Sequence, residues 1–340
     1  MDKIVVTGGN GFIGSNLINY LINKNFYVIN IDKSKYSKDS YLLRNIKSKN
    51  YKFFKIDIND KKIFNILSKY KPKAIFNLAA ETHVDRSIDA PFDFIKSNIL
   101  GTFNILKQVR KFTKKNKKKV RIVHISTDEV YGDLKKNSRS DENYPYKPSS
   151  PYSASKASAD HLIKSYARTY GLDAVISNCC NNFGPGQFPE KLIPTLLFNI
   201  LNNKPLPIYG NGSNSREWIY VEDHCRGLLT IYKKGITGES YNIGTGVNIS
   251  NLNLTKLLIK IAKTKMQIGK NTKIKFVKDR PGHDMRYALN SKKIKKTLNW
   301  RPLNTFEKSL EKTFIWYKDN YQFFNNFSKQ SFYRRLGLKI

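Results

Sequence analysis

Near its start the chain reads Lys3-Ile4-Val5-Val6-Thr7-Gly8-Gly9-Asn10-Gly11-Phe12-Ile13-Gly14, and this stretch is the strongest indication of the fold class. β-Branched residues over 3–7 predict a short buried strand, and a glycine-rich turn follows it directly. Glycines at 8, 11 and 14 permit a tight turn, close approach of a pyrophosphate and close helix–strand packing. Apolar residues at helical spacing continue through residues 17–22. The stretch therefore predicts a strand, a phosphate-binding loop and a helix whose N-terminus faces the phosphates.

An acidic residue, Asp32, follows the next predicted strand, residues 26–31. A carboxylate there can hydrogen bond a ribose 2′-hydroxyl and would repel a 2′-phosphate, which favours NAD over NADP. Lys33 and Lys35 act against this preference, because a lysine attracts a phosphate. A glycine-rich turn alone is a weak signal, but strand, glycines, helix, strand and acid in one unit are specific.

Strands and helices continue to alternate through the first half of the chain. Further strands are predicted at 52–56, 74–78, 121–126 and 174–178, helices at 62–70, 92–110 and 151–171, and a charged surface loop at 111–119. This alternation predicts an α/β fold with a Rossmann-type, doubly wound parallel sheet. Residues 1–178 form the expected dinucleotide-binding domain with the catalytic residues. Residues 179–340 form a smaller, mainly substrate-binding portion, some segments of which return to the main sheet.

Composition excludes some classes of protein. The 340 residues are 40% hydrophobic and contain no apolar run long enough to span a membrane. A strand at the very start leaves no room for a signal peptide, and three cysteines do not suggest a disulfide framework, so a cytoplasmic location is expected. The net charge of +35 could indicate a nucleic-acid or membrane partner. Because the lysines are spread over many segments without a binding signature, compositional drift explains the charge better, and neither partner is expected.

A second cluster, residues 121–156, carries the chemistry. Thr127-Asp128-Glu129 ends a predicted strand, and Tyr152 and Lys156 lie one helical turn apart on a predicted helix. An ammonium near a tyrosine favours the phenolate, which makes the tyrosine a base near neutral pH. Both motifs also have a non-catalytic interpretation. Tyr152 and Lys156 could be a surface pair, and Thr127-Asp128-Glu129 could only cap a helix.

Several motifs together resemble the extended short-chain dehydrogenase/reductases that act on nucleotide sugars, and within them the dTDP-glucose 4,6-dehydratases. The motifs are 7–14, Tyr152-x-x-x-Lys156, 127–132 (Thr-Asp-Glu-Val-Tyr-Gly), 79–87, 188–194 and 279–284, so the likeness runs nearly from end to end. Related epimerases usually have Ser or Ala where this chain has Asp128-Glu129. Mild departures are Thr82, where Ser is common, and Cys179-Cys180 in place of Cys-Ser.

The resemblance implies an NAD-dependent lyase that makes a 4-keto-6-deoxyglucose nucleotide for deoxysugars such as rhamnose. Tyr152 would accept the proton from the C4 hydroxyl as NAD takes the hydride, and Lys156 would hold the nicotinamide ribose. Elimination of water across C5–C6 then needs an acid and a base in opposite protonation states. By the family pattern Asp128 is the acid, Glu129 is the base, and Thr127 hydrogen bonds the C4 oxygen.

The other binding residues follow from matching positions in the family. The expected NAD contacts are Gly8, Gly11, Phe12, Ile13, Gly14, Asp32, Lys33, Ser34, Lys35, Asp57, Ile58, Leu78, Ala79, Ala80, Glu81, Thr82, Ser97, Tyr152, Lys156 and Asn182. The expected substrate contacts are Thr82, Thr127, Asn181, Lys191, Leu192, Pro207, Ile208, Tyr209, Arg216, Asn251, Asp279, Arg280, Pro281, Gly282 and His283. A guanidinium can bind a pyrophosphate through two hydrogen bonds, so Arg216 is its natural partner, with Arg280 as a second cation.

No His, Cys and Asp cluster has metal-ligand spacing, so no metal is expected. The resemblance also implies a homodimer that pairs the helices at 92–110 and 151–171 into a four-helix bundle. Two alternatives stay open. One is a 4,6-dehydratase or epimerase for a UDP-, CDP- or GDP-sugar, and the other is an NAD-binding regulatory protein, which the intact catalytic set argues against. The final deoxysugar and the role of residues 321–340 do not follow from the sequence.

Overall fold

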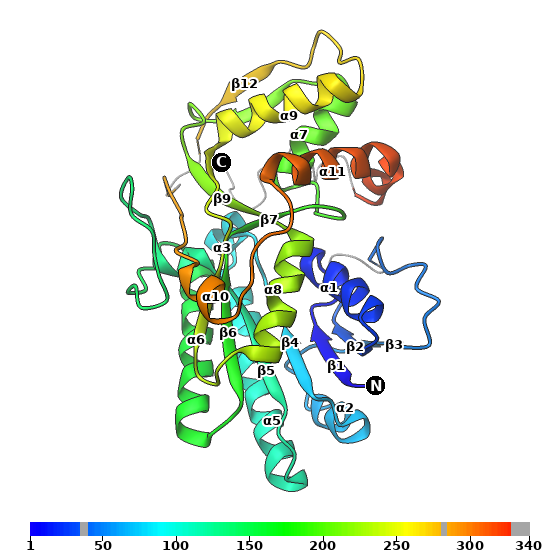
Figure 1. The fold of residues 1–340 in the computed structure, drawn as a ribbon, viewed down its shortest axis with the longest axis vertical. Helices are drawn as coiled ribbons and strands as arrows, with labels where there is room; N and C mark the ends of the chain where they lie inside the picture. The colour runs from blue at the N-terminus through cyan, green and yellow to red at the C-terminus, as the bar shows by residue number, and fades with distance from the viewer. Residues whose placement is uncertain (35–39, 280–283, 328–340) are drawn as a thin grey trace.

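Seven parallel strands form the central sheet in the order β10-β6-β5-β4-β1-β2-β3 (Figure 1). The computed structural model describes residues 1–34, 40–279 and 284–327. The strands are β1 (Lys3–Thr7), β2 (Tyr27–Asp32), β3 (Tyr51–Lys55), β4 (Ala74–Asn77), β5 (Arg121–Thr127), β6 (Ala174–Cys179) and β10 (Ser240–Ile243). The order reverses direction between β1 and β4, as in doubly wound dinucleotide-binding folds, where ligands bind beyond the strands' carboxyl ends.

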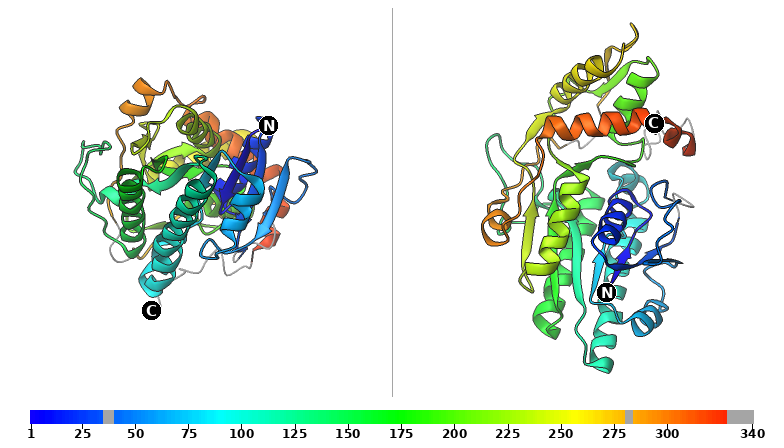
Figure 2. Two further views of the ribbon diagram at one scale, coloured as in Figure 1. Left: turned by 90° about the horizontal axis from the view of Figure 1, so that it is seen from below. Right: turned by 45° about the vertical axis from the view of Figure 1, so that its right-hand side comes forward.

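Helices cover both faces of this sheet, so the strands are apolar on both sides (Figure 2). In β1, Ile4 and Val6 point to the core under α1 (Phe12–Asn23) and α8 (Val221–Lys234). Val5 points to the opposite core, under α2 (Ile63–Tyr70), α5 (Gly101–Asn116) and α6 (Pro151–Tyr170). The β-branched run at 3–7 is therefore explained by burial on alternate faces.

A smaller part lies beyond the carboxyl ends of the strands (Figure 1). It has a three-stranded sheet, β11-β9-β7, a two-stranded sheet, β12-β8, and its own apolar core. Its strands are β7 (Asn181–Phe183), β8 (Leu206–Tyr209), β9 (Ser215–Tyr220), β11 (Asn248–Ser250) and β12 (Ile274–Val277), and its helices are α7 (Leu192–Leu201), α9 (Asn251–Lys265), α11 (Phe306–Asp319) and the 3₁₀ turn η3 (Tyr321–Asn326).

The chain crosses between the two parts more than once. After β9 it returns to the main sheet through α8 and β10, and β10 pairs in parallel with β6. The short helix α10 (Lys292–Thr297) also packs against the main part, because Ile294 is buried in the core beside α1 and α8.

The predicted helix at 92–110 is helical throughout but not uniform, and the predicted loop at 111–119 is wrong. After the short helix α3 (Val84–Asp89) come α4 (Pro91–Phe94), a π-helical stretch η1 (Ile95–Leu100), and then α5, which continues to Asn116. The helix extends into the lysine-rich segment because Phe112 is fully buried and anchors it. It ends at Lys117, which has a left-handed φ of 53°. Lysine is a good helix former, so its charge alone does not predict a loop. None of the described helices is both long and apolar enough to cross a membrane.

Candidate active site

The glycine-rich loop between β1 and α1 is shaped for close approach. Gly8 has a φ of +68°, and a Cβ on it would lie 2.7 Å from the backbone of Ala79. A Cβ on Gly14 would lie 2.3 Å from the carbonyl oxygen of Gly8. Gly11 is the N-cap of α1 and has no side chain to cap the helix. The first N–H groups of α1 can therefore donate hydrogen bonds to a bound phosphate. Phe12 and Ile13, which follow, are half-buried.

Asp32 ends β2 beside this loop. Its carboxylate accepts hydrogen bonds from the backbone N–H of Asn10, at 3.0 Å, and of Ser34, at 2.6 Å. Burial raises the pKa of Asp32, although these two hydrogen bonds act in the opposite direction. The next residue, Lys33, forms an ion pair of 3.0 Å with Glu81. The structure thus brings the ends of β2 and β4 together above β1, as expected for a dinucleotide site.

The remaining predicted cofactor residues lie at neighbouring strand ends. Asp57 and Ile58 follow β3, and Leu78, Ala79, Ala80, Glu81 and Thr82 follow β4. Asp57 accepts hydrogen bonds from the backbone and side chain of Asn59, both at 2.9 Å, so its carboxylate already stabilises the local turn. Thr82 is exposed.

The π-helical stretch η1 explains how Ser97 and its neighbour Asn98 reach the site. Ser97 and Asn98 are buried. The Asn98 side chain accepts from Glu81 N at 2.9 Å and donates to Glu81 O at 3.0 Å and to the Ser155 hydroxyl at 2.8 Å. Asn98 therefore joins the end of β4 to the catalytic helix α6. The sequence analysis missed Asn98, since a π-helix leaves no periodic signal, although such turns are frequent at functional sites.

Thr127, Asp128 and Glu129 lie where β5 runs into the 3₁₀ turn η2 (Asp128–Tyr131). Thr127 caps this turn by accepting from Glu129 N at 3.3 Å, so the capping alternative is also realised. Asp128 is buried, and its Oδ2 has no hydrogen-bond partner among the described residues. Burial, then the nearby charges of Glu129 and Glu217, raise the pKa of Asp128 well above its usual range, whereas Arg216 lowers it. Glu129 is half-buried.

Tyr152 and Lys156 lie in the first two turns of α6, and both are buried. The Lys156 ammonium donates to the carbonyl oxygen of Ile125 at 2.7 Å. The pKa of Tyr152 is raised well above its usual value, by burial first and then by Glu129, while a hydrogen bond with Thr127 lowers it. The expected lowering of the Tyr152 pKa by Lys156 is thus not seen in this structure. Burial has the larger effect on the pKa of Tyr152, because it disfavours the charged form of a phenol.

The predicted substrate residues come mainly from the smaller part. Asn181 begins β7, Lys191 and Leu192 begin α7, Pro207, Ile208 and Tyr209 lie in β8, Asn251 begins α9, and Asp279 follows β12. Asn251 is buried and its Oδ1 has no partner among the described residues, as a ligand-facing amide requires. The Ile208 side chain is buried in the core of the smaller part, so only its backbone can face a ligand. Lys35, Arg280, Pro281, Gly282 and His283 lie outside the described residues.

Arg216 is buried in β9 and points toward the segment at 284–287. Its guanidinium donates to the carbonyl oxygens of Ser215, at 2.9 Å, and Asp284, at 2.9 Å, and lies 4.6 Å from the centre of the Tyr287 ring. Tyr287, which the sequence analysis did not single out, lies near Glu129, since that charge contributes to its raised pKa. Arg216 and Tyr287 therefore connect the smaller part to the acidic pair in η2, which follows β5.

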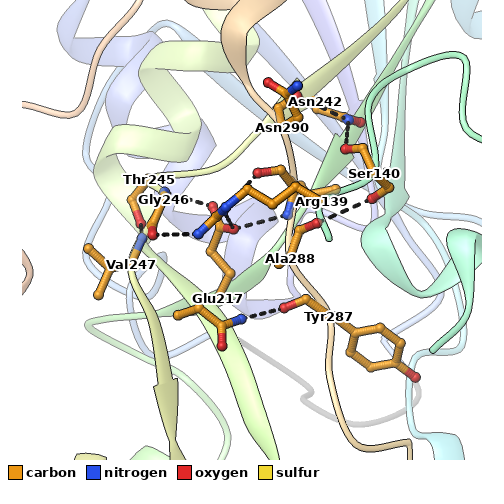
Figure 3. A network of polar contacts seen from close by, with 12 residues as sticks. Arg139, Ser140, Glu217, Asn242, Thr245, Gly246, Val247, Tyr287, Ala288 and Asn290 are labelled. Carbon is orange, nitrogen blue, oxygen red and sulfur yellow. Dashed lines mark hydrogen bonds and ion pairs between the residues drawn. The ribbon is translucent and has the colours of Figure 1, made fainter. Parts of the chain in front are cut away.

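An ion pair between exposed Arg139 and buried Glu217 lies where four segments of the chain meet (Figure 3). Glu217 is fully buried and bonds Arg139 at 2.7 Å. It also accepts from Gly246 N at 2.8 Å and Leu289 N at 3.0 Å. Both carboxylate oxygens are thus satisfied, which a buried charge requires. This pair could not be predicted from the sequence, because its residues come from distant segments.

Asn182 is a predicted NAD contact, but its side chain forms hydrogen bonds within the protein. The amide donates to the carbonyl oxygen of Cys180 at 3.0 Å, and its oxygen lies 2.8 Å from Nδ1 of His224. His224 is fully buried, and burial lowers its pKa to about 3, so it is neutral. A ligand contact by Asn182 would therefore come from its backbone.

Comparison with known proteins agrees with this geometry. A model of the family "GDP-mannose 4,6 dehydratase" matches residues 5–313. The dTDP-glucose 4,6-dehydratases of Neisseria meningitidis and Escherichia coli are each 45% identical to this chain, and each alignment covers 99% of both proteins.

Solved structures give the same result. A dTDP-glucose 4,6-dehydratase from Bacillus anthracis, in complex with NAD, has a TM-score of 0.86 at 37% identity, covering 95% of this chain and 98% of that one. A UDP-glucose 4-epimerase from Thermotoga maritima reaches 0.84 at 29% identity, covering 93% and 99%, so the fold alone does not separate the two activities. The full-length identity does separate them, and the chain belongs to the dTDP-glucose 4,6-dehydratase family.

Proposed function

We propose that this chain is an NAD-dependent dTDP-glucose 4,6-dehydratase, a lyase that converts dTDP-glucose into dTDP-4-dehydro-6-deoxyglucose. One observation of the site carries the proposal. Asp128 and Glu129, adjacent carboxylates in unlike surroundings, lie at the end of β5, and Tyr152 is close enough for the charge of Glu129 to raise its pKa. An epimerase needs a tyrosine base but no acid–base pair for elimination.

The residues at the strand ends fit NAD. The glycine loop leaves no space for Cβ atoms at Gly8 and Gly14, and the N-terminus of α1 is open for a phosphate. Asp32 offers a carboxylate where a ribose 2′-hydroxyl would lie. When bound, NAD would accept a hydride reversibly, and the positive charge of its oxidised ring would favour the phenolate of Tyr152.

The first chemical step is oxidation at C4 of the sugar. Tyr152 takes the proton of the C4 hydroxyl while the hydride leaves the same carbon, and Thr127 hydrogen bonds the C4 oxygen. Lys156 orients the ribose and adds a positive charge near Tyr152. The buried position of Tyr152 excludes water, which strengthens each of these electrostatic interactions.

The second step is elimination of water across C5–C6. The C4 ketone makes the C5 proton acidic, because the carbanion is an enolate. Glu129, half-buried, removes this proton as a carboxylate, and Asp128, whose pKa is raised, protonates the departing C6 hydroxyl. Bound cofactor would return the hydride to C6 while Glu129 reprotonates C5, which would regenerate the oxidised cofactor.

Arg216 would bind the pyrophosphate of the substrate, and the loops of the smaller part would contact its base and sugar. We also propose a homodimer in the cytoplasm. Exposed apolar side chains on η1 and the helices around it support the dimer: Ile88, Phe92, Ile95, Leu100, Phe103 and Tyr170. Such a patch is expected at an interface between protein chains.

The test is mass spectrometry of dTDP-glucose after incubation with the protein and NAD in heavy water. The expected product has lost one water, has gained one carbon-bound deuterium, and forms without net NADH. An unchanged sugar mass would contradict dehydration of this substrate. UDP-, CDP- and GDP-sugars under the same conditions then identify another nucleotide specificity.

A further inference from the structure

Three titratable side chains form a buried cluster behind the catalytic helix. Lys156 and Asp160 lie one turn apart on α6 and are 4% and 0% exposed, and His124 of β5, 1% exposed, lies against both. His124 Nε2 is 3.4 Å from Lys156 Nζ and 3.5 Å from Asp160 Oδ1. Neither His124 nor Asp160 has a part in the reaction described above.

A chain of hydrogen bonds through the sheet fixes the proton on His124. The backbone N–H of Ala79 donates to Thr7 Oγ1 at 3.2 Å, and the Thr7 hydroxyl donates to Asn77 Oδ1 at 2.7 Å. This orients the Asn77 amide, so that its Nδ2, a donor only, faces His124 Nδ1 at 3.1 Å. Nδ1 must therefore be the acceptor, and the proton of the neutral ring lies on Nε2.

With a proton on Nε2, His124 cannot accept from Lys156. Two donors, Nε2–H and the lysine ammonium, then lie side by side, and a negative charge is needed to accommodate them. Asp160 supplies it: its Oδ2 accepts from the Ser126 hydroxyl at 2.7 Å and the Tyr146 hydroxyl at 3.0 Å. Its Oδ1 makes no hydrogen bond within the described part of the chain and has His124 Nε2 beside it.

We propose that Asp160 is a positioning residue that keeps Lys156 in its ammonium form, and that the Thr7–Asn77–His124 relay holds His124 neutral for this purpose. A protonated His124 would place a second positive charge 3.4 Å from Lys156. The relay thus gives the buried cluster one charge state: a neutral imidazole, an ammonium and a carboxylate.

The charges around Lys156 agree with this assignment. Burial lowers the pKa of Lys156, while Asp160 on its own helix and Cys179 of β6 raise it. Cys179 is a neutral thiol, because burial raises its pKa to about 12, which leaves Asp160 as the anion that acts on Lys156. Burial raises the pKa of Asp160 itself, but Lys156 and the hydrogen bonds from Ser126 and Tyr146 act in the opposite direction. Burial and Lys156 lower the pKa of His124 well below its usual value. On the side facing the substrate, Tyr152 is neutral until it loses its proton in the reaction.

The test is the variant Asp160→Asn in the full-length enzyme with bound NAD. The substrate is dTDP-6-deoxyglucose, which has no C6 hydroxyl to lose, so the reaction stops at oxidation and does not depend on Asp128 or Glu129. Loss of the Lys156 proton should limit the oxidation rate at alkaline pH. We expect Asp160→Asn to move this alkaline limit to lower pH by about one unit or more.

Asp223→Asn is the matched control, since Asp223 is a buried carboxylate paired with Arg226 at 2.7 Å, away from Lys156. It should lower the thermal unfolding midpoint and leave the alkaline limit in place. An Asp160→Asn enzyme that is slower by the same factor at every pH would show a structural role only and overturn the proposal.

A measurement on the wild-type protein keeps the proposal testable if the variant does not fold. Nitrogen NMR of histidine-labelled protein should show one ring with an unprotonated Nδ1 and a protonated Nε2 that does not titrate between about pH 5 and 9. His124→Gln should remove that signal. If the His124 ring, identified by its loss in His124→Gln, titrates in this range or carries its proton on Nδ1, the relay is overturned. The proposal rests on the proposed function, but this readout does not: inactivity toward dTDP-glucose would count against the function alone.

Discussion

Asp128 and Glu129 are adjacent in the chain, yet Asp128 is 3% exposed whereas Glu129 is half-buried. The 3₁₀ turn that Thr127 caps buries one carboxyl and leaves the other partly exposed. Two groups of similar intrinsic acidity thereby lie in unlike surroundings, and burial raises the pKa of Asp128, as the acid of an acid–base elimination requires.

Replacing the acid should separate the two steps of the reaction. Asp128→Asn keeps the shape of the side chain but cannot protonate the C6 hydroxyl, so dehydration should fall by about 10²- to 10⁴-fold. Oxidation of dTDP-6-deoxyglucose, followed by the absorbance of bound NADH, should stay within a few-fold of the wild-type rate. Equal losses in both assays would mean that Asp128 supports the oxidation step instead.

Replacing the base gives a different phenotype. Glu129→Gln should retain NAD and bind dTDP-glucose but lose both dehydration and exchange of the C5 proton with heavy water. Product formation and deuterium content, followed by mass spectrometry, check this. Near-normal turnover by the variant would remove Glu129 as the base.

Asp128 should also reduce the stability of the fold as pH rises. Its pKa in the folded protein lies well above the value in an unfolded chain. Between these two values only the unfolded chain loses the proton, so the native state loses stability as pH rises through this window. Asp128→Asn removes this cost, and its thermal unfolding midpoint should exceed the wild-type midpoint more at pH 8 than at the acidic end of the stable range. A difference that is independent of pH would contradict the burial argument.

The cofactor should remain bound through purification, because each cycle regenerates it. Denaturing the purified protein should release NAD into the supernatant. Gly14→Ala should remove it, since the new Cβ would lie 2.3 Å from Gly8 O. Gly171→Ala is the control: its φ of +63° strains alanine, but nothing lies within 4 Å of the new Cβ. It should cost about 1 to 2 kcal/mol of stability and keep NAD.

The proposed dimer can be tested on the exposed apolar patch. Leu100 and Phe103 are 47% and 40% exposed. Leu100→Glu together with Phe103→Glu should convert a dimer into a monomer, which light scattering during gel filtration measures. Exposed Ile236, which lies after α8 and outside the patch, provides the control Ile236→Glu. A monomeric wild-type protein would contradict the dimer at once.

The sequence was informative where one local pattern carries the whole feature. The run at 3–14 and the acid at Asp32 predicted the dinucleotide loop of a doubly wound parallel sheet, and the spacing of Tyr152 and Lys156 placed both residues on one face of a helix. The spacing could not predict the pKa of Tyr152, because that depends on burial by elements that fold from elsewhere in the chain.

Other parts of the site were hidden for the same reason. Asn98 contacts Glu81 and Ser155 from the π-helical stretch η1, and Glu217 meets Arg139 only in the folded chain. Asp160 was not predicted either, although a signal was present. It lies four residues after Lys156, and this spacing places a third polar side chain on the catalytic face of α6.

The return of the chain to β10 has a consequence for protein engineering. A fragment that stops after β6 would expose the edge of β6 along its length, and an open, apolar edge strand promotes aggregation. The two parts are therefore not modular in sequence. A chimera that exchanges the smaller part for that of another nucleotide-sugar enzyme must keep α8 and β10 with the sheet, and needs crossover points on both sides of them.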